Sequence, residues 1–160
     1  MQDGHPASTT ILVGLDGSPD SHEAVRWAAG LARSLGAEVV AVHALGMLDQ
    51  LEPDGPLVPT QPHREEIAER AEGPWTEALA GVDHRVVLHD GSPVDVVLEV
   101  ATEVGAGLIV LGSRGIGGSP ALLLGSTSSQ VAQRAACPVV IVPGPGRGAA
   151  EPGSEQVAAG

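Results

Sequence analysis

The part of the chain with the clearest binding chemistry is a glycine-rich segment that runs from Gly112 to Ser126 and is followed by Thr127 and Ser128. Glycines at 112, 115 and 125 can bring the backbone close to a ligand and can take the positive φ values that a phosphate cradle uses. The helix predicted to begin at Ser126 leaves N–H groups free and turns the positive end of its dipole outward. The segment therefore predicts an anion site built from one strand end and one helix start.

Side chains of the same segment add hydrogen-bond donors. The hydroxyls of Ser126, Thr127 and Ser128 can donate to phosphate oxygens, and Arg114 is the only cationic side chain in the segment. Ser113 precedes it at the expected strand end. Two plainer interpretations stay open: the segment could be a flexible surface loop, and Arg114 could be a solvated surface arginine.

Short apolar runs that predict strands alternate with helical periods between residues 10 and 142. The predicted strands are 10–14, 39–44, 85–88, 108–111 and 139–142. The predicted helices are 18–36, 64–80 with a break at Gly73-Pro74, a third that begins at Ser92-Pro93, and 126–136. This alternation, with nearly continuous apolar strands, predicts one α/β domain: a doubly wound, five-stranded parallel sheet with helices on both faces.

Doubly wound sheets bind ligands beyond the carboxyl ends of their strands, where the strand order reverses. That rule indicates three segments, which must meet at one edge of the sheet: 14–18, Ala44 onward, and Gly112 onward. Residues 45–63 contain four prolines and two glycines, which predicts a long loop whose role the sequence leaves open.

The composition argues against nucleic acid and anionic membranes as binding partners. The 160 residues carry a formal net charge of −12 and include no lysine, so the surface repels nucleic acid and anionic lipid. Trp27 and Trp75 are the only aromatic residues, which leaves few platforms on which a single nucleic-acid strand could stack. Cys137 is the single cysteine, and no signal peptide or membrane span is recognisable, so we expect a cytoplasmic protein.

The sequence lacks the residues that several other kinds of binding or catalytic site require. The histidines show no metal-ligand spacing and there is no cysteine cluster, so no protein-made metal site is predicted, and Cys137 is expected to be a small core residue. A Walker A loop needs lysine, and the first strand leads into Gly14-Leu15-Asp16-Gly17-Ser18 rather than a dinucleotide fingerprint. No Gly-x-Ser-x-Gly elbow occurs. No base, nucleophile and orienting group can be named, so fast catalysis is not expected.

The pattern Gly-x2-Gly-x9-Gly-Ser, at Gly112, Gly115, Gly125 and Ser126, resembles the nucleotide-binding signature of universal stress proteins. The resemblance extends from Thr10 to Pro143 and includes Ile-Leu-Val-Gly-Leu-Asp-Gly-Ser at the start and Cys-Pro-Val-Val-Ile-Val at the end. It implies a Rossmann-like fold of the adenine nucleotide alpha-hydrolase type over residues 9–143. Residues 1–8 and 144–160 are polar or rich in Gly, Pro, Ala and Glu, so we expect disordered tails there.

The resemblance also implies roles for single residues. Asp16 matches an acidic residue beside the ribose and phosphates, where it could accept from a ribose hydroxyl or help to hold Mg²⁺. Its alternative role is to close the turn after the strand. Ala44 matches a position whose backbone reads the adenine edge, and Gly14 ends the strand beside the ligand. The family often forms homodimers through its last strand, which is Val139–Val142 in this chain.

These expectations combine into one function: a stress-response or regulatory protein that holds ATP with Mg²⁺ on the glycine-rich loop and hydrolyses it slowly at most. Three alternatives remain. The first is a nucleotide-free interaction module of the same fold. The second is an adenylating or pyrophosphatase-type enzyme, although Gly-Leu-Asp-Gly-Ser-Pro replaces the Ser-Gly-Gly-x-Asp-Ser stretch of such enzymes. The third is a flavin-binding electron carrier. The downstream partner, the stress signal, and whether ATP is substrate or ligand stay open.

Overall fold

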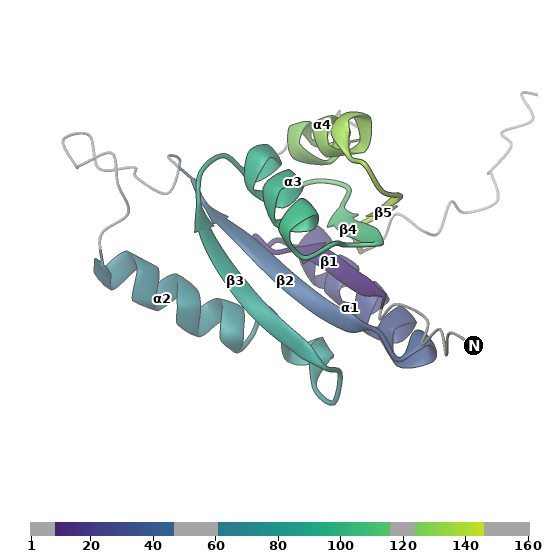
Figure 1. Ribbon diagram of the computed structural model, residues 1–160. Coiled ribbons are helices and arrows are strands. Elements are labelled where there is room, and N and C mark those ends of the chain that lie inside the picture. The colour runs from purple at the N-terminus through teal and green to yellow at the C-terminus, as the bar shows by residue number, and fades with distance from the viewer. Residues whose placement is uncertain (1–8, 47–60, 116–123, 146–160) are drawn as a thin grey trace, which may run out of the picture.

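Five parallel strands form one sheet in the order β3-β2-β1-β4-β5 (Figure 1). The computed structural model describes residues 9–46, 61–115 and 124–145. The strands are β1 Thr10–Gly14, β2 Glu38–Leu45, β3 His84–Asp90, β4 Leu108–Gly112 and β5 Val139–Val142. The helices are α1 Pro19–Leu35, α2 Gln61–Glu72, α3 Pro93–Glu103, α4 Ser126–Arg134 and the short 3-10 helix η2 Glu77–Leu79.

The strand order reverses between β1 and β4. Leu12 of β1 pairs with Val40 of β2 on one side and with Ile109 of β4 on the other, all in parallel register. The chain builds β1, β2 and β3 outward in one direction and then returns to add β4 and β5 in the other. The gap between the carboxyl ends of β1 and β4 is therefore the place where a doubly wound sheet binds ligands.

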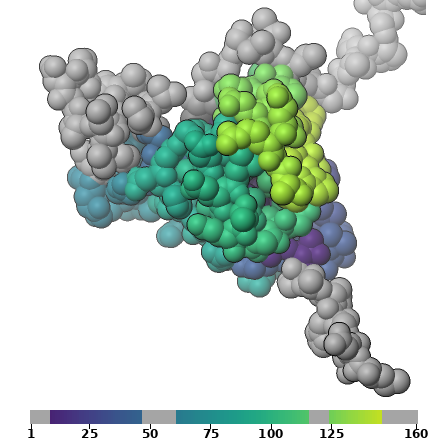
Figure 2. Space-filling view, turned by 45° about the horizontal axis from the view of Figure 1, so that its top comes forward, coloured from purple at the N-terminus to yellow at the C-terminus, as the bar shows by residue number. Residues whose placement is uncertain are grey.

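Helices cover both faces of the sheet, as predicted. Ile11 and Val13 point into a core shared with α1 and η2, whereas Leu12, between them in the sequence, points into a core shared with α3 and α4. In Figure 1, α3 and α4 lie in front of the sheet and α1 lies behind it. Figure 2 shows α3 (green) beside α4 and β5 (yellow-green) on one surface of the molecule. The prediction of a doubly wound α/β sheet is confirmed.

Local signals in the sequence set the helix ends. Ser18 caps α1 by accepting a hydrogen bond from the Ser21 N–H, and Gly36 ends that helix in the left-handed region at φ 62°. Ser92 caps α3 in the same way through the Asp95 N–H. The break predicted at Gly73-Pro74 is also present, because α2 ends at Glu72 and η2 begins only at Glu77.

A few boundaries differ from the prediction. α4 ends at Arg134 rather than at 136, because the chain becomes extended at Ala135 (ψ 143°) on its way to Cys137-Pro138 and β5. β3 is longer than predicted, because it pairs with β2 along the whole of His84–Asp90. Gly144 is buried, so ordered chain continues past residue 143. Residues 1–8, 47–60 and 146–160, which cover most of the predicted tails and long loop, lie outside the described residues.

No described helix is both long enough and apolar enough to cross a membrane.

Candidate functional site

The candidate site lies at the carboxyl edge of the sheet, in the gap between β1 and β4. Asp16 is at its centre, two residues after β1. The Ser18 N–H donates to Asp16 Oδ1 at 2.8 Å, and Gly17 completes the turn at φ 75°. A Cβ atom on Gly115 would lie 2.6 Å from Asp16 Oδ2. One carboxylate oxygen therefore closes the turn, as the alternative role requires, while the other faces the glycine-rich loop.

The two described ends of the glycine-rich segment meet beside Asp16. The Gly125 N–H donates to the Ser113 carbonyl at 2.6 Å. The Ser128 hydroxyl is 3.1 Å from the same carbonyl and also 3.1 Å from the Gly125 carbonyl. A Cβ atom on Gly125 would sit 3.4 Å from the Arg114 Cα. The end of β4 and the start of α4 are thus joined into one surface, although residues 116–123 between them are not described.

Two of the three signature glycines, Gly112 and Gly115, are needed for close approach, and none of the three has an unusual backbone angle. Positive φ occurs at five described glycines, and Gly112, Gly115 and Gly125 are not among them. The expectation of positive φ is therefore wrong for these three. A Cβ atom at position 112 would instead lie 2.7 Å from the backbone carbon of Asp20, and one at 115 would collide with the Asp16 carboxylate. A side chain at 112 would push α1 away from β4, and one at 115 would displace the Asp16 carboxylate.

A residue that the sequence analysis missed holds the loop in place. Asp20, in the first turn of α1, is 9 % exposed. Its Oδ2 accepts hydrogen bonds from the Ser113 hydroxyl at 2.7 Å and from the Arg114 N–H at 3.0 Å. A Cβ atom on Gly144, just past β5, would overlap its Oδ1. The only signal in the sequence is an acid in a helix first turn, which is common and says nothing of a contact with Ser113.

A second missed feature is an aromatic support under the β1–α1 turn. The Trp75 indole lies against Gly17, where a Cβ atom would be 2.7 Å from the ring. The His43 ring meets Trp75 edge to face, with centroids 5.2 Å apart, and His43 Nδ1 is 2.7 Å from the Leu15 carbonyl oxygen. His43 thus has a structural role. Together the two rings fix the turn that carries Asp16.

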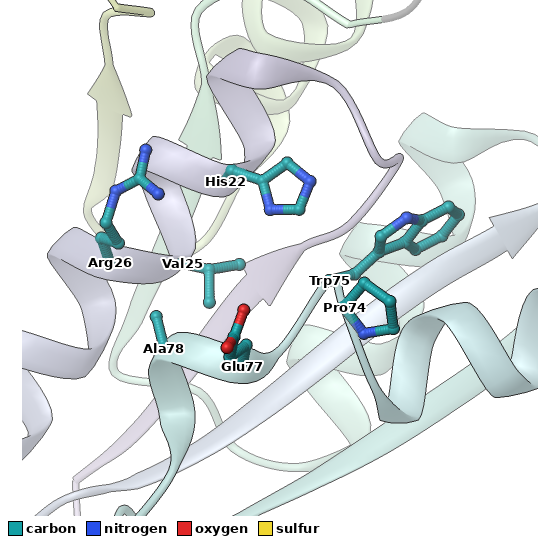
Figure 3. Close-up of a pocket in the computed structure, with 7 residues that line it drawn as sticks. All are labelled: His22, Val25, Arg26, Pro74, Trp75, Glu77 and Ala78. Atoms are coloured by element: carbon teal, nitrogen blue, oxygen red, sulfur yellow. The ribbon is translucent and has the colours of Figure 1, made fainter.

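Trp75 also forms one wall of a cavity of about 180 Å³ between α1 and the segment around η2 (Figure 3). The other lining residues are His22, Val25, Arg26, Pro74, Glu77 and Ala78. None of the predicted site residues lines it, so this cavity is separate from the glycine-rich loop.

The remaining predicted residues fall into two groups. Gly14 and Ala44 lie on the neighbouring strands β1 and β2; because Gly14 pairs with Val42, Ala44 is level with Asp16 at the same edge. Ser113 and Ser128 are buried, and their hydroxyls donate to Asp20 and to backbone carbonyls respectively. Ser126 is exposed and Thr127 half-buried at the start of α4, where no described side chain caps the first turn. Of the three predicted hydroxyl donors, Ser126 and Thr127 are the better placed to reach a ligand.

Metal binding and nucleophilic chemistry would each need particular side chains at the site. Among the described residues, no set of three His, Cys, Asp or Glu side chains is arranged to hold a metal ion. Burial raises the pKa of the Cys137 thiol, which keeps it protonated and a poor nucleophile. Cys137 packs against the core on the α3 side of the sheet, as expected of a core residue. The arrangement suits binding of an anion by backbone N–H groups more than covalent chemistry.

Comparison with known proteins agrees with this fold. The universal stress protein family matches residues 8–143. A universal stress protein of Thermus aquaticus is 38% identical over 140 residues, which cover 83% of this chain and 97% of that protein. One from Mycolicibacterium smegmatis is 37% identical over 143 residues, which cover 88% of this chain and 48% of that protein. The chain thus spans about half the length of the M. smegmatis relative.

A solved structure adds a ligand to the comparison. A universal stress protein determined in complex with cAMP superposes with a TM-score of 0.62 at 30% sequence identity. The match covers 84% of this chain and 95% of that one. The family match extends from the first strand to the last, and the two relatives cover 88% and 83% of the chain. The chain belongs to the universal stress protein family.

Proposed function

We propose that this protein binds ATP together with Mg²⁺ at the carboxyl edge between β1 and β4, as a regulatory protein of the cytoplasm. The observation that carries the proposal is the meeting of the β4 end with the start of α4 directly opposite Asp16. N–H groups at a helix start bind phosphate well, and the close-packed glycines keep the backbone within reach of it. Arg114 adds one cationic group at the same place.

The edge has room for a nucleotide laid across it. β2, β1 and β4 are consecutive in the sheet, so Ala44 and Gly112 stand on strands about 10 Å apart. Phosphates over the β4–α4 surface then bring the ribose to Asp16 and the base to the backbone at Ala44. The solved relative in complex with cAMP supports an adenine nucleotide as the ligand class.

The residues at the site fit Mg²⁺ that arrives with the phosphates. Mg²⁺ is commonly held by one or two carboxylates plus phosphate oxygens and waters, and Asp16 Oδ2 faces the loop. Bound there, the ion would offset the repulsion between phosphate and carboxylate. No described side chain is placed as a general base beside it, so we propose that hydrolysis is slow at most.

We also propose a homodimer. β5 is the outer strand beyond β4, and Val139, Val140 and Ile141 are only half-buried along it. An apolar edge strand with unpaired backbone groups pairs readily with a second copy.

ATP with Mg²⁺ should raise the melting temperature of protein first freed of nucleotide. A ligand that binds only the folded state adds about 2.7 kcal/mol at 100 times its dissociation constant. For a domain of this size that is a shift of roughly 5–10 °C in a thermal-shift titration. GTP and FMN serve as controls and should shift it less. A melting temperature that does not change at millimolar ATP would rule out ATP as the ligand. A larger increase in melting temperature with cAMP than with ATP would show that the ligand is the cyclic nucleotide.

Gly115→Ala should weaken ATP binding by tens to hundreds of times, whereas Ser126→Ala should weaken it about tenfold. The new methyl group displaces the Asp16 carboxylate, which the Ser18 N–H holds from its other side. A loss of a few kcal/mol at such a contact corresponds to that change in affinity. The serine variant loses one hydroxyl and keeps every helix N–H group. Calorimetric titration measures both affinities, and circular dichroism confirms that both variants are folded. If Gly115→Ala binds ATP as tightly as the parent, the phosphates do not lie on this loop.

Asp20→Asn should lower ATP affinity about tenfold without touching the ligand. The amide is a weaker partner for the Ser113 hydroxyl and the Arg114 N–H, since hydrogen bonds to a charged group contribute about 1.5–3 kcal/mol. Loss of about 1.4 kcal/mol of loop ordering gives the tenfold effect. The matched control is Asp83→Asn, an exposed carboxylate before β3. If the folded Asp20→Asn protein binds ATP as the parent does, Asp20 does not position the loop.

Val140→Lys should convert the dimer into a monomer. A charged side chain at the centre of a four-residue edge strand opposes pairing, since the same residue of the second copy lies near it. Light scattering at high micromolar concentration measures the mass. A monomeric parent would contradict the dimer. A dimeric, folded Val140→Lys protein would place the interface elsewhere.

A further inference from the structure

Three large apolar side chains follow one another along one flank of α1. Trp27, Leu31 and Leu35 are spaced by four residues, so they lie on the same side of the helix. Trp27 is 41% exposed, Leu35 is 59% exposed, and Leu31 is half-buried against the core. Gly30 and Ser34, both exposed, adjoin them on the helix surface. We call these five residues the α1 strip. These five residues carry no charge, although the chain has a net charge of −12, and the next residue at the same spacing, Glu23, is paired with Arg26.

The α1 strip lies on the side of α1 that faces the β5 edge. The opposite flank faces η2, because Arg33 donates to the Ala78 and Ala80 carbonyls and His22 and Arg26 line the cavity of Figure 3. The flank that carries the strip also carries Asp20, which contacts Gly144 just after β5.

The strip is also level with the middle of β5. α1 runs antiparallel to the strands, since its first turn meets the end of β4. Trp27 is about 10 Å along the helix from Asp20, and Val140 is about 13 Å along the extended chain from Gly144. Leu31 and Val140 pack against the same core cluster. Trp27 and Leu31 therefore flank the outer strand at its centre.

The edge of β5 is too short to make a stable dimer without help. Val139–Val142 is about 13 Å long, and Pro138 and Pro143 at its ends have no N–H groups to extend the pairing. A standard interface buries about 800 Å² per partner, several times what four edge residues can offer. Trp27 alone adds roughly 60–100 Å², given its exposure and the usual area of a large aromatic side chain. A second copy that covers β5 thus gains stability if it covers the α1 strip too.

Two-fold symmetry brings the two strips together. If β5 pairs antiparallel with β5 of a second copy, the axis is perpendicular to the joined sheet, and both α1 helices stay on the same face. α1 packs mainly over β1 and β4 and also touches β5. Midway between β1 and β4, its axis is about 10 Å from the symmetry axis, so the two helices are about 19 Å apart. Helices in direct contact are 8–10 Å apart, so large side chains must fill the difference.

The composition of the strip suits that gap. Trp27 is the longest of the three side chains and extends furthest into the gap, and Leu31 and Leu35 line it. A Cβ atom on Gly30 would meet nothing within 4 Å, so the small residues leave space into which a side chain of the second copy fits. We propose that the α1 strip is the second half of the dimer interface and packs against the α1 strip of a second copy of this chain. The proposal rests on the β5 dimer proposed above and adds the surface that stabilises it.

The test compares two variants that add one negative charge to the full-length chain. Trp27→Glu places it in the α1 strip, and Ala80→Glu places it at an exposed position beside η2, away from β5. Analytical ultracentrifugation should show at least a 100-fold higher dimer dissociation constant for Trp27→Glu and a parent-like value for Ala80→Glu. Both should keep the parent's circular dichroism and ATP affinity, because neither position lies at the nucleotide site.

The outcomes separate this proposal from the β5 dimer. If the parent and Trp27→Glu dimerise equally tightly, while Val140→Lys is monomeric, the strip is not part of the interface and the β5 dimer stands. A monomeric parent overturns both. Fluorescence gives a second readout: in Trp75→Phe the only tryptophan is Trp27, and its emission should shift to the blue as protein concentration passes through the dissociation constant. An emission maximum that is the same above and below that concentration overturns the proposal.

Discussion

The carboxylate of Asp20 connects three parts of the chain that are distant in sequence. It belongs to the first turn of α1, it accepts hydrogen bonds from Ser113 and Arg114 after β4, and it contacts Gly144 after β5. Each of these segments leaves the same edge of the sheet. A buried carboxylate is costly unless hydrogen bonds and a helix start compensate its charge, and here both do. The start of the glycine-rich loop is therefore fixed before any ligand arrives.

Tight packing around this carboxylate explains the glycines better than backbone flexibility does. Gly112 lies directly against the Asp20 backbone, Gly144 against its side chain, and Gly115 against Asp16. Each glycine removes a Cβ atom where two segments must nearly touch. The result is a surface whose backbone N–H groups stay close to the gap between β1 and β4. Such preorganisation lowers the entropy cost of binding, because these segments of the protein need not be ordered when a ligand binds.

The sequence was sufficient for the fold because the fold follows from local patterns. β1 and β5 begin and end at the predicted residues, and both predicted serine caps are present. The same sequence could not reveal Asp20 or Trp75 as parts of the site. Asp20 reaches Ser113 across 93 positions, and Trp75 reaches Gly17 from a segment beyond a helix break. A pattern within a short window carries no information about contacts of that range.

The binding of a polyphosphate proposed for this acidic protein has to rely on short-range interactions. At physiological salt the Debye length is about 8 Å, so exposed carboxylates on the far side of the domain act weakly at the site. The N–H groups in the first turn of α4, which no described side chain caps, lie beside the gap and are screened little, whereas the Arg114 N–H is donated to Asp20. The position of the backbone N–H groups at the site therefore matters more for binding than the net charge of the protein. Asp20, the glycines and the Trp75–His43 pair fix that position. Because α1 carries Asp20 at one end and the uncharged strip along its flank, one helix contributes to the order of the loop and to the surface beside β5.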